Sequence, residues 1–408
     1  MAPLGTRGAT GARLRVWPRE ARLRNAADPR LRPMKYLRRF AAPLLAVATL
    51  ACGDSGPTDP SQRLVAVGRV ERGATVRLVA RDGASAADTI VSEVAVSPAG
   101  AGSVNGTMVR LLQAGAVTVS ARASDGRTLA ATLDVVAPPT VYFDAIANGN
   151  RDIYSVALDG GDVKRWTTAA GEDAHPSVAG GTLVFSTQRH GNAELYAMPT
   201  AAGGAEQRLT TTAASETHPA LNKSGTSIAF VSDAGGSPRI HVAPTSLASP
   251  ARLTASAFGF GFTLEVDPSW SPAGDRLAFM STANGRANLF TTASTPGAMP
   301  AAVAGSGSGQ TDVEPAWSPD GNYLAFASTR AGPSQIFLLD LRTGAYRQLT
   351  SGSSPAGQPG WLADGRVVFT RFVGSETSLW WVDPASSEPP VEVPVAGVRL
   401  AGHATGSR

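Results

Sequence analysis

The stretch Asp312-Val-Glu-Pro-Ala-Trp-Ser-Pro-Asp-Gly-Asn-Tyr-Leu-Ala-Phe-Ala-Ser328 decides the fold of this chain. It predicts a short strand that ends at Trp317, a tight turn over residues 318–321, and an apolar strand over residues 323–327. Proline presets the backbone angle φ for such a turn, and glycine accepts the positive φ that closes it. Two more strands should follow before residue 351. One such unit has too little apolar surface to fold alone, so the sequence should repeat it.

The pattern of proline, glycine and phenylalanine does recur, in five units. Their anchoring prolines are Pro176, Pro219, Pro268, Pro315 and Pro359, which stand 43, 49, 47 and 44 residues apart. Repeats of this length with four short strands per unit are typical of a β-propeller.

A sixth unit precedes these five and lacks its innermost strand. Residues 141–143, 152–156 and 163–167 match only the second, third and fourth strands of a blade. A spare tail, residues 395–403, follows the last unit. Propellers often close by taking a strand from the far terminus, which removes exposed sheet edges. The sequence therefore predicts an all-β fold with a six-bladed β-propeller over residues 140–404.

Four units also end alike, in Arg165-Trp-Thr167, Arg208-Leu-Thr210, Arg252-Leu-Thr254 and Gln348-Leu-Thr350. Together with the Pro-x-Trp-Ser-Pro-Asp-Gly and Ala-Phe motifs, this pattern resembles the TolB-like family of WD40-like β-propeller repeats. The resemblance covers about residues 140–400. It implies the fold and leaves the activity open, because one repeat serves many roles.

Positive charge is concentrated at the N-terminus. The chain has a formal net charge of +4, but residues 1–51 hold eleven basic and two acidic residues, so the remainder is net −5. A net acidic body offers no field that would neutralise phosphates, and we expect no nucleic-acid partner.

The basic segment has the layout of a secretion signal. Residues 34–39 form a positive n-region, and the apolar run over residues 40–50 is too short to span a membrane. Its end, Thr49-Leu-Ala-Cys52, resembles a bacterial lipoprotein signal, which implies that Cys52 is lipidated. The alternative is an ordinary cleaved signal with an incidental cysteine. We expect residues 1–33 to be a misassigned start and residues 53–62 to be a linker.

Residues 63–136 change to short alternating strands separated by turns such as Asn105-Gly106. This pattern predicts a small β-sandwich. The segment 94–104 followed by 113–119 resembles bacterial Ig-like domains of group 2. Such modules act as spacers or adhesive units, and we expect a rigid stalk.

The residues before the anchor prolines are the best candidates for a binding site. The residue directly before each proline is His175, His218, Asp267, Glu314 and Gln358 in turn, and two positions earlier stand Asp173, Glu216, Glu265, Asp312 and Ala356. Alternate residues of a strand share a face, so both rows should ring the channel mouth. Such rings would suit a basic segment of a partner. They would also suit a cation, because histidines beside carboxylates are acceptable metal ligands. The alternative is that these residues only cap the inner strands and hydrogen-bond neighbouring blades.

The sequence contains neither a Gly-x-Ser-x-Gly elbow nor a phosphate-binding glycine-rich loop. Together with the signal segment and the repeats, this predicts a monomeric, membrane-anchored envelope protein that faces the periplasm or the cell surface. Its propeller would bind a protein, peptide or glycan without catalysis, and with no cofactor unless a cation occupies the channel. The competing hypothesis is a polysaccharide lyase or hydrolase that uses the histidines and carboxylates of the channel mouth.

Overall fold

The computed structural model describes residues 62–82, 88–201, 204–247, 249–256, 258, 263–307 and 309–406. The regular elements of this part are all strands. No helix in this part is long and apolar enough to cross a membrane. The predicted secretion signal, Cys52 and residues 53–61 of the predicted linker lie outside the described residues, while Gln62 begins the first strand.

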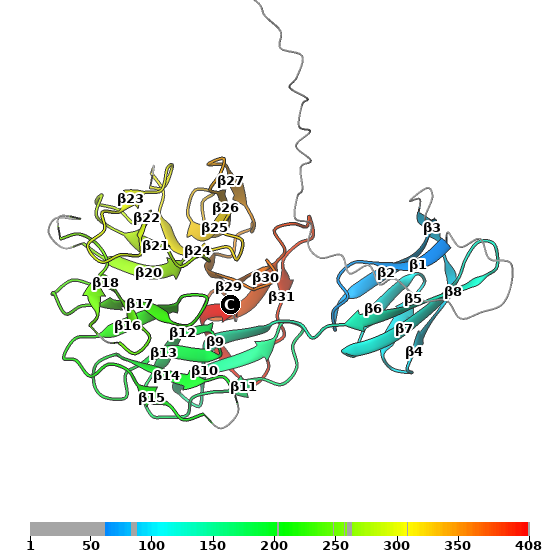
Figure 1. The fold of residues 1–408 in the computed structure, drawn as a ribbon, viewed down its shortest axis with the longest axis horizontal. Helices are drawn as coiled ribbons and strands as arrows, with labels where there is room; N and C mark the ends of the chain where they lie inside the picture. Colours follow the sequence, from blue (N-terminus) through cyan, green and yellow to red (C-terminus); the bar gives the residue numbers. More distant parts are fainter. Residues whose placement is uncertain are drawn as a thin grey trace, which may run out of the picture. The chain divides into compact units, whose positions relative to one another are not determined.

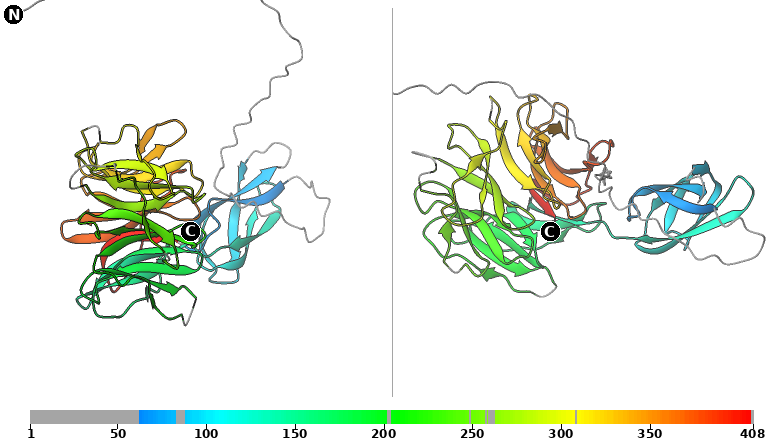
Figure 2. Two further views of the ribbon diagram at one scale, coloured as in Figure 1. Left: turned by 60° about the vertical axis from the view of Figure 1, so that its left-hand side comes forward. Right: turned by 45° about the horizontal axis from the view of Figure 1, so that its top comes forward.

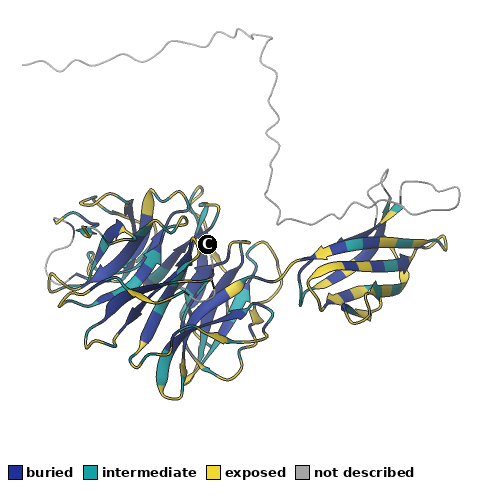
Figure 3. Ribbon diagram, turned by 60° about the horizontal axis from the view of Figure 1, so that its bottom comes forward, coloured by how far each residue is buried: buried dark blue, intermediate teal, exposed yellow. Residues whose placement is uncertain are grey.

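The N-terminal part of the described chain is a two-sheet β-sandwich. One sheet has the strand order β1-β2-β6-β5 with β3 beside β2, and the other has the order β4-β7-β8. The strands are β1 (Gln62–Val67), β2 (Thr75–Asp82), β3 (Asp88–Ile90), β4 (Ser92–Ser97), β5 (Gly102–Asn105), β6 (Met108–Leu111), β7 (Gly115–Arg122) and β8 (Thr128–Val135). Buried residues alternate with more exposed ones along β6, β7 and β8 (Figure 3), and the buried residues of the sandwich share one core that includes Leu78, Val119 and Leu133. The resemblance to bacterial Ig-like domains stays a prediction.

The rest of the described chain forms six four-stranded antiparallel sheets, the blades of a propeller (Figure 1). Blade 1 contains β32 (Arg399–Gly406), β9 (Thr140–Ala147), β10 (Asn150–Ala157) and β11 (Lys164–Arg165). Blade 2 contains β12 (Asp173–Ala179), β13 (Thr182–Thr187), β14 (Glu194–Pro199) and β15 (Gln207–Arg208). Blade 3 contains β16 (Glu216–Leu221), β17 (Ser227–Ser232), β18 (Arg239–Pro244) and β19 (Ala251–Arg252).

The remaining three blades repeat this order. Blade 4 contains β20 (Glu265–Trp270), β21 (Arg276–Ser281), β22 (Asn288–Ala293) and β23 (Ala301–Ala302). Blade 5 contains β24 (Asp312–Trp317), β25 (Tyr323–Ser328), β26 (Gln335–Asp340) and β27 (Tyr346–Gln348). Blade 6 contains β28 (Ala356–Trp361), β29 (Val367–Val373), β30 (Glu376–Val382) and β31 (Val391–Glu392). Figure 2 shows from two further sides how these sheets follow one another around a common centre. The prediction of an all-β, six-bladed propeller is confirmed.

The C-terminal strand closes the ring. β32, red in Figure 1, pairs antiparallel with β9, from Arg399 opposite Ile146 to Gly406 opposite Val141. It supplies the innermost strand that the first unit lacks in the sequence. Because β32 covers the edge of β9 that the first unit would otherwise expose, the predicted closure by the tail is confirmed.

The repeated phenylalanine explains why neighbouring blades hold together. One phenylalanine stands in the second strand of every blade and is at most 2% exposed: Phe143, Phe185, Phe230, Phe279, Phe326 and Phe369. Several core clusters join residues of two adjacent blades. Truncating such a buried aromatic side chain typically costs about 3–5 kcal/mol, so the repeat is held mainly by apolar packing between sheets.

Candidate binding site in the central channel

Every inner strand of the propeller is bulged at the same place. The register shifts in β12, β16, β20, β24 and β28 surround the residue before the anchor proline. β32 has two register shifts, and the second, between Gly402 and Thr405, spans the equivalent residue. These residues are His175, His218, Asp267, Glu314, Gln358 and His403, all with φ between 49° and 56°. Left-handed backbone costs about 1 kcal/mol for a residue other than glycine. The proline that follows in five strands has no N–H to donate, so the bulge fits its chemistry.

The bulge separates the two rows of polar residues that the sequence predicts. The residues directly before the prolines line the central cavity. Asp173, Glu216, Glu265 and Asp312, two positions earlier, are at most 2% exposed and do not line it. The expectation that both rows face the channel therefore holds for the first row only. The extra residue of each bulge breaks the two-residue alternation on which that expectation rested.

The row outside the cavity makes contacts within and between blades. Asp312 pairs with Arg330 at 2.9 Å in the same blade. Glu265 reaches back to blade 3, where it accepts the Thr254 hydroxyl at 2.8 Å. Glu216 accepts hydroxyls from Thr212 and Ser232 at 2.9 and 3.0 Å, while burial raises its pKa. Asp173 pairs with Arg189 at 3.1 Å. These contacts match the structural alternative stated for these carboxylates.

The central cavity has a volume of about 140 Å³ and receives three consecutive residues from each inner strand. Its polar ring consists of the six bulged residues, which we call the bulge ring: His175, His218, Asp267, Glu314, Gln358 and His403. The three histidines come from blades 1, 2 and 3, and the other three residues from blades 4, 5 and 6. The ring therefore has a histidine half and an acidic half.

The histidine half is tightly clustered. The ring centroid of His175 lies 3.8 Å from that of His218 and 4.2 Å from that of His403. Burial lowers the pKa of His175 well below its usual range, with further lowering by the two neighbouring histidines. Burial and His403 lower the pKa of His218 to about 4. His175 and His218 are therefore neutral at physiological pH.

His403 differs from the other two histidines because its Nδ1 lies 3.0 Å from Asp144 Oδ2. Burial alone would lower the pKa of His403, but the hydrogen bond to Asp144 and the charges of Asp144, Asp267 and Glu314 outweigh it and raise the pKa. Asp144 is fully buried and also accepts the backbone N–H of His175 at 3.1 Å. One carboxylate thus connects two members of the histidine half.

The acidic half holds two carboxylates that have no arginine or lysine partner in the described part of the chain. Among the described residues, neither Asp267 nor Glu314 forms an ion pair with an arginine or a lysine. Asp267 Oδ1 lies 3.5 Å from His218 Nε2, and Glu314 Oε2 accepts the backbone N–H of Gln358 at 2.6 Å. Burial raises the pKa of Asp267 to about 6, and burial together with the charge of Asp267 raises the pKa of Glu314 to about 7. Their ionised forms would be stabilised by a cation in the cavity.

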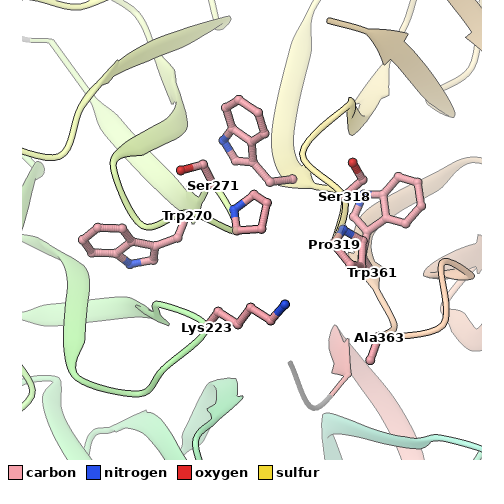
Figure 4. Close-up of a pocket in the computed structure, with 9 residues that line it drawn as sticks. Lys223, Trp270, Ser271, Ser318, Pro319, Trp361 and Ala363 are labelled. Carbon is pink, nitrogen blue, oxygen red and sulfur yellow. The ribbon is translucent and has the colours of Figure 1, made fainter.

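A second pocket lies at the other ends of the inner strands (Figure 4). Trp270, Trp317 and Trp361, the final residues of three inner strands, line it and are 4–6% exposed. Trp270 and Trp361 donate their indole N–H groups to Ala220 and Ala316 of the preceding blades. The tryptophans of the repeat motif therefore serve mainly as contacts between blades.

Sequence reasoning missed His403 because Ala404 stands where the other units have their anchor proline. A partial signal is the residue after the repeated phenylalanine, which is polar in blades 1 and 2 but is Val231 in blade 3, where the ring residue is His218. The polar residues are Asp144 in blade 1 and Ser186 in blade 2, and both contact the histidine of their own blade. In blades 4 and 5, where the ring residue is acidic, the same position holds Met280 and Ala327.

Residues 261–387 match the family described as TolB beta propeller domain. None of the curated proteins compared with the sequence matches it. Among solved structures, TolB from Acinetobacter baumannii is 15% identical with a TM-score of 0.58, over 72% of this chain and 81% of that one.

Two further structures show the same likeness. An Agrobacterium tumefaciens protein given the name TolB is 16% identical with a TM-score of 0.51, over 64% of this chain and 90% of its own. A chain of a nidogen/laminin complex is 13% identical with a TM-score of 0.50, over 65% of this chain and 97% of its own. At these identities the structures show the fold alone. Residues 261–387 therefore resemble the TolB beta propeller domain, and the described chain has the fold of a six-bladed β-propeller.

Proposed function

We propose that this chain is a lipid-anchored protein of the bacterial envelope whose propeller binds a protein or peptide partner at the central cavity, without catalysis. The observation that carries this proposal is the bulge ring. Six of six equivalent positions are polar and face one cavity. The bulge itself requires no polar side chain there, whereas a binding site does.

The charge of the ring indicates the chemistry of the ligand. Asp267 and Glu314 face the cavity without an arginine or lysine partner in the described chain, while Asp312, two positions before Glu314, pairs with Arg330. A positively charged group in the cavity would offset the repulsion between the two carboxylates and the cost of their burial. We therefore expect the bound ligand to place positive charge in the acidic half.

Two other observations support this assignment of role and location. One similar structure comes from a nidogen/laminin complex, so a chain of this fold takes part in a protein assembly there. The Arg-rich segment, the apolar run and Cys52 of the sequence support attachment to a membrane through lipid. The β-sandwich would then serve as the spacer between anchor and propeller.

A pull-down from envelope extract tests the binding role. The full chain should capture a partner, and the double variant Asp267→Asn with Glu314→Gln should capture at least tenfold less. Glu388→Gln, at an exposed position, is the matched control and should capture normally. Equal capture by the double variant and the control would remove the cavity from the proposal.

The competing function is hydrolysis or elimination on a polysaccharide. It is favoured by one contact, His218 Nε2 beside Asp267 Oδ1, because a neutral histidine next to a carboxyl group can act as a general base. Incubation of the full chain with acidic and neutral polysaccharides distinguishes the two. Product formation that is lost in His218→Asn would favour the enzyme.

A further inference from the structure

We infer that His175, His218 and His403 form a binding site for a divalent transition metal ion such as Zn²⁺ at the centre of the propeller. One nitrogen from each ring can be chosen so that all three lie within 4.8 Å of one another. This inference rests on the proposed function in one respect. The metal ion would be a source of the positive charge that we expect beside the acidic half of the cavity.

The orientation of His175 leaves its Nε2 free for a metal. Its Nδ1 lies 3.1 Å from the hydroxyl oxygen of Ser186. The single hydroxyl proton of Ser186 is donated to the carbonyl oxygen of Ala174 at 3.1 Å. Ser186 must therefore accept the proton of His175 Nδ1, which places the proton of the neutral ring there and the lone pair on Nε2.

His403 is held in the arrangement that protein metal sites commonly use. Its Nδ1–H donates to the Asp144 carboxylate at 3.0 Å, and a histidine that binds metal through one nitrogen usually donates the other N–H to such a group. The second oxygen of Asp144, Oδ1, is buried and has no hydrogen-bond partner within the described chain. The Asp144 carboxylate is therefore only partly satisfied by hydrogen bonds within the described chain.

His218 completes the set from the third blade. Its Nδ1 lies 3.0 Å from Thr217 Oγ1, and its Nε2 points to the acidic half, 3.5 Å from Asp267 Oδ1. All three histidines therefore engage a hydroxyl or a carboxylate through Nδ1. Asp267 lies at the open side of the cluster, where a fourth ligand or a bound water would complete a tetrahedral site.

Coordination requires only a small closure of the rings. Two nitrogens on one tetrahedral Zn²⁺ stand about 3.4 Å apart, since each Zn–N bond is about 2.1 Å long. The present limit of 4.8 Å can close through rotation of the side chains, for which the cavity of about 140 Å³ leaves room. The contact of Gln358 Nε2 with His403 Nε2 at 3.2 Å would be exchanged for the metal bond.

The composition of the cluster suits a metal, because imidazole nitrogens are common ligands of Zn²⁺. The chain has five histidines, and these three, distant in sequence, meet at one point. The other ring positions hold Asp267, Glu314 and Gln358, so the histidines are confined to one half.

Titration of the full chain with Zn²⁺ after removal of metal by a chelator tests the inference. We expect one equivalent to bind, and Co²⁺ to give the visible absorption of a tetrahedral complex. His218→Asn and His403→Asn should each lower the affinity at least tenfold. Asparagine is chosen because it tolerates the positive φ of these positions. His190→Asn, at an exposed histidine outside the cavity, is the matched control.

Two controls keep the result interpretable. The melting temperature of each variant without metal must equal that of the metal-free wild type. His218→Asn, which gives up the contacts with Thr217 and Asp267 but not the buried Asp144, is the variant expected to meet this condition. Absence of Zn²⁺ binding by the wild type, or equal binding by His218→Asn and His190→Asn, overturns the inference. Normal partner capture by a chain that binds no metal would overturn the metal site alone. One equivalent of metal without any partner would instead contradict the proposed function.

Discussion

Gln358 of blade 6 and His403 of the C-terminal strand contact each other twice across the closure of the propeller. Gln358 Oε1 accepts the backbone N–H of His403 at 3.1 Å, and Gln358 Nε2 lies 3.2 Å from His403 Nε2. The bulge ring is therefore also the place where the chain closes on itself. Stability of the closure and binding at the cavity should depend on some of the same residues.

Gly402 provides the first prediction, because its position leaves no space for a side chain. A Cβ there would lie 2.3 Å from Gln358 Oε1, on a backbone with φ of 134°. We expect Gly402→Ala to lower the free energy of unfolding by about 1–3 kcal/mol, through strain and loss of the Gln358 hydrogen bond. Gly149→Ala, where φ is 81° and nothing lies within 4 Å, controls for backbone strain alone. Denaturant unfolding of both variants measures the difference. Equal losses in the free energy of unfolding would show that the close approach to Gln358 makes no contribution.

Closure by the tail gives the second prediction. Deleting residues 394–408 removes β32 and exposes the edge of β9. Blades depend on their neighbours, so the whole propeller should melt at a lower temperature in one cooperative step. Removal of only residues 407–408 is the control. An unchanged melting temperature in the longer deletion would show that β32 contributes nothing to closure.

The third prediction separates the buried carboxylates from the cavity. Asp312→Ala would leave the Arg330 guanidinium without its charge partner. The Asp312 side chain of this pair is fully buried. Breaking such a pair commonly costs about 3–5 kcal/mol. We expect a loss of this size in chemical denaturation, and no such loss for the exposed control Glu388→Ala. A variant that remains fully stable but loses partner binding would assign Asp312 to the binding site.

Glu314 gives a prediction about pH. Burial and Asp267 raise its pKa from 4.5 to about 7, so folding favours the protonated form. The stabilisation from this group is fully present below pH 4.5 and is lost as pH rises through 7. Glu314→Gln should match the wild type near pH 5 and exceed it by about 2 kcal/mol near pH 8, measured with a chelator present. A stability difference that does not change between these pH values would contradict the raised pKa.

Anchoring gives the last prediction on a variant. Cys52→Ser removes the only thiol that lipid could modify, and the protein should move from the membrane fraction to the soluble fraction. Fractionation of cells that express each form, followed by detection of the propeller, measures this change. A variant that stays membrane-bound at its uncleaved size would show that Cys52 is not the anchor.

The fold could be predicted from the sequence because the same pattern of strands and turns recurs in five units. Each anchor proline, turn glycine and buried phenylalanine confirms the others, and the missing strand of blade 1 matches the spare tail in length. The position of β32 beside β9 followed from these two observations together. Such agreement between local signals is what makes a sequence specify one fold.

The site could be predicted only in part, because it depends on a backbone irregularity. His175, His218, Asp267, Glu314 and Gln358 do meet in one cavity, as the repeat suggested. The bulge that sends the other row of acids into the blades has no distinct residue pattern, since proline alone does not specify it. The repeat pattern did not identify His403 as a ring residue, because its strand is the last in sequence and carries Ala404 in place of proline.

Diffraction from crystals of the full chain grown with one equivalent of Zn²⁺, recorded at the zinc absorption edge, tests the central claim most directly. The account predicts one anomalous peak at the centre of the propeller, about 2.1 Å from the Nε2 atoms of His175, His218 and His403. Anomalous peaks only at sites outside the cavity, or no anomalous peak at all, would contradict it.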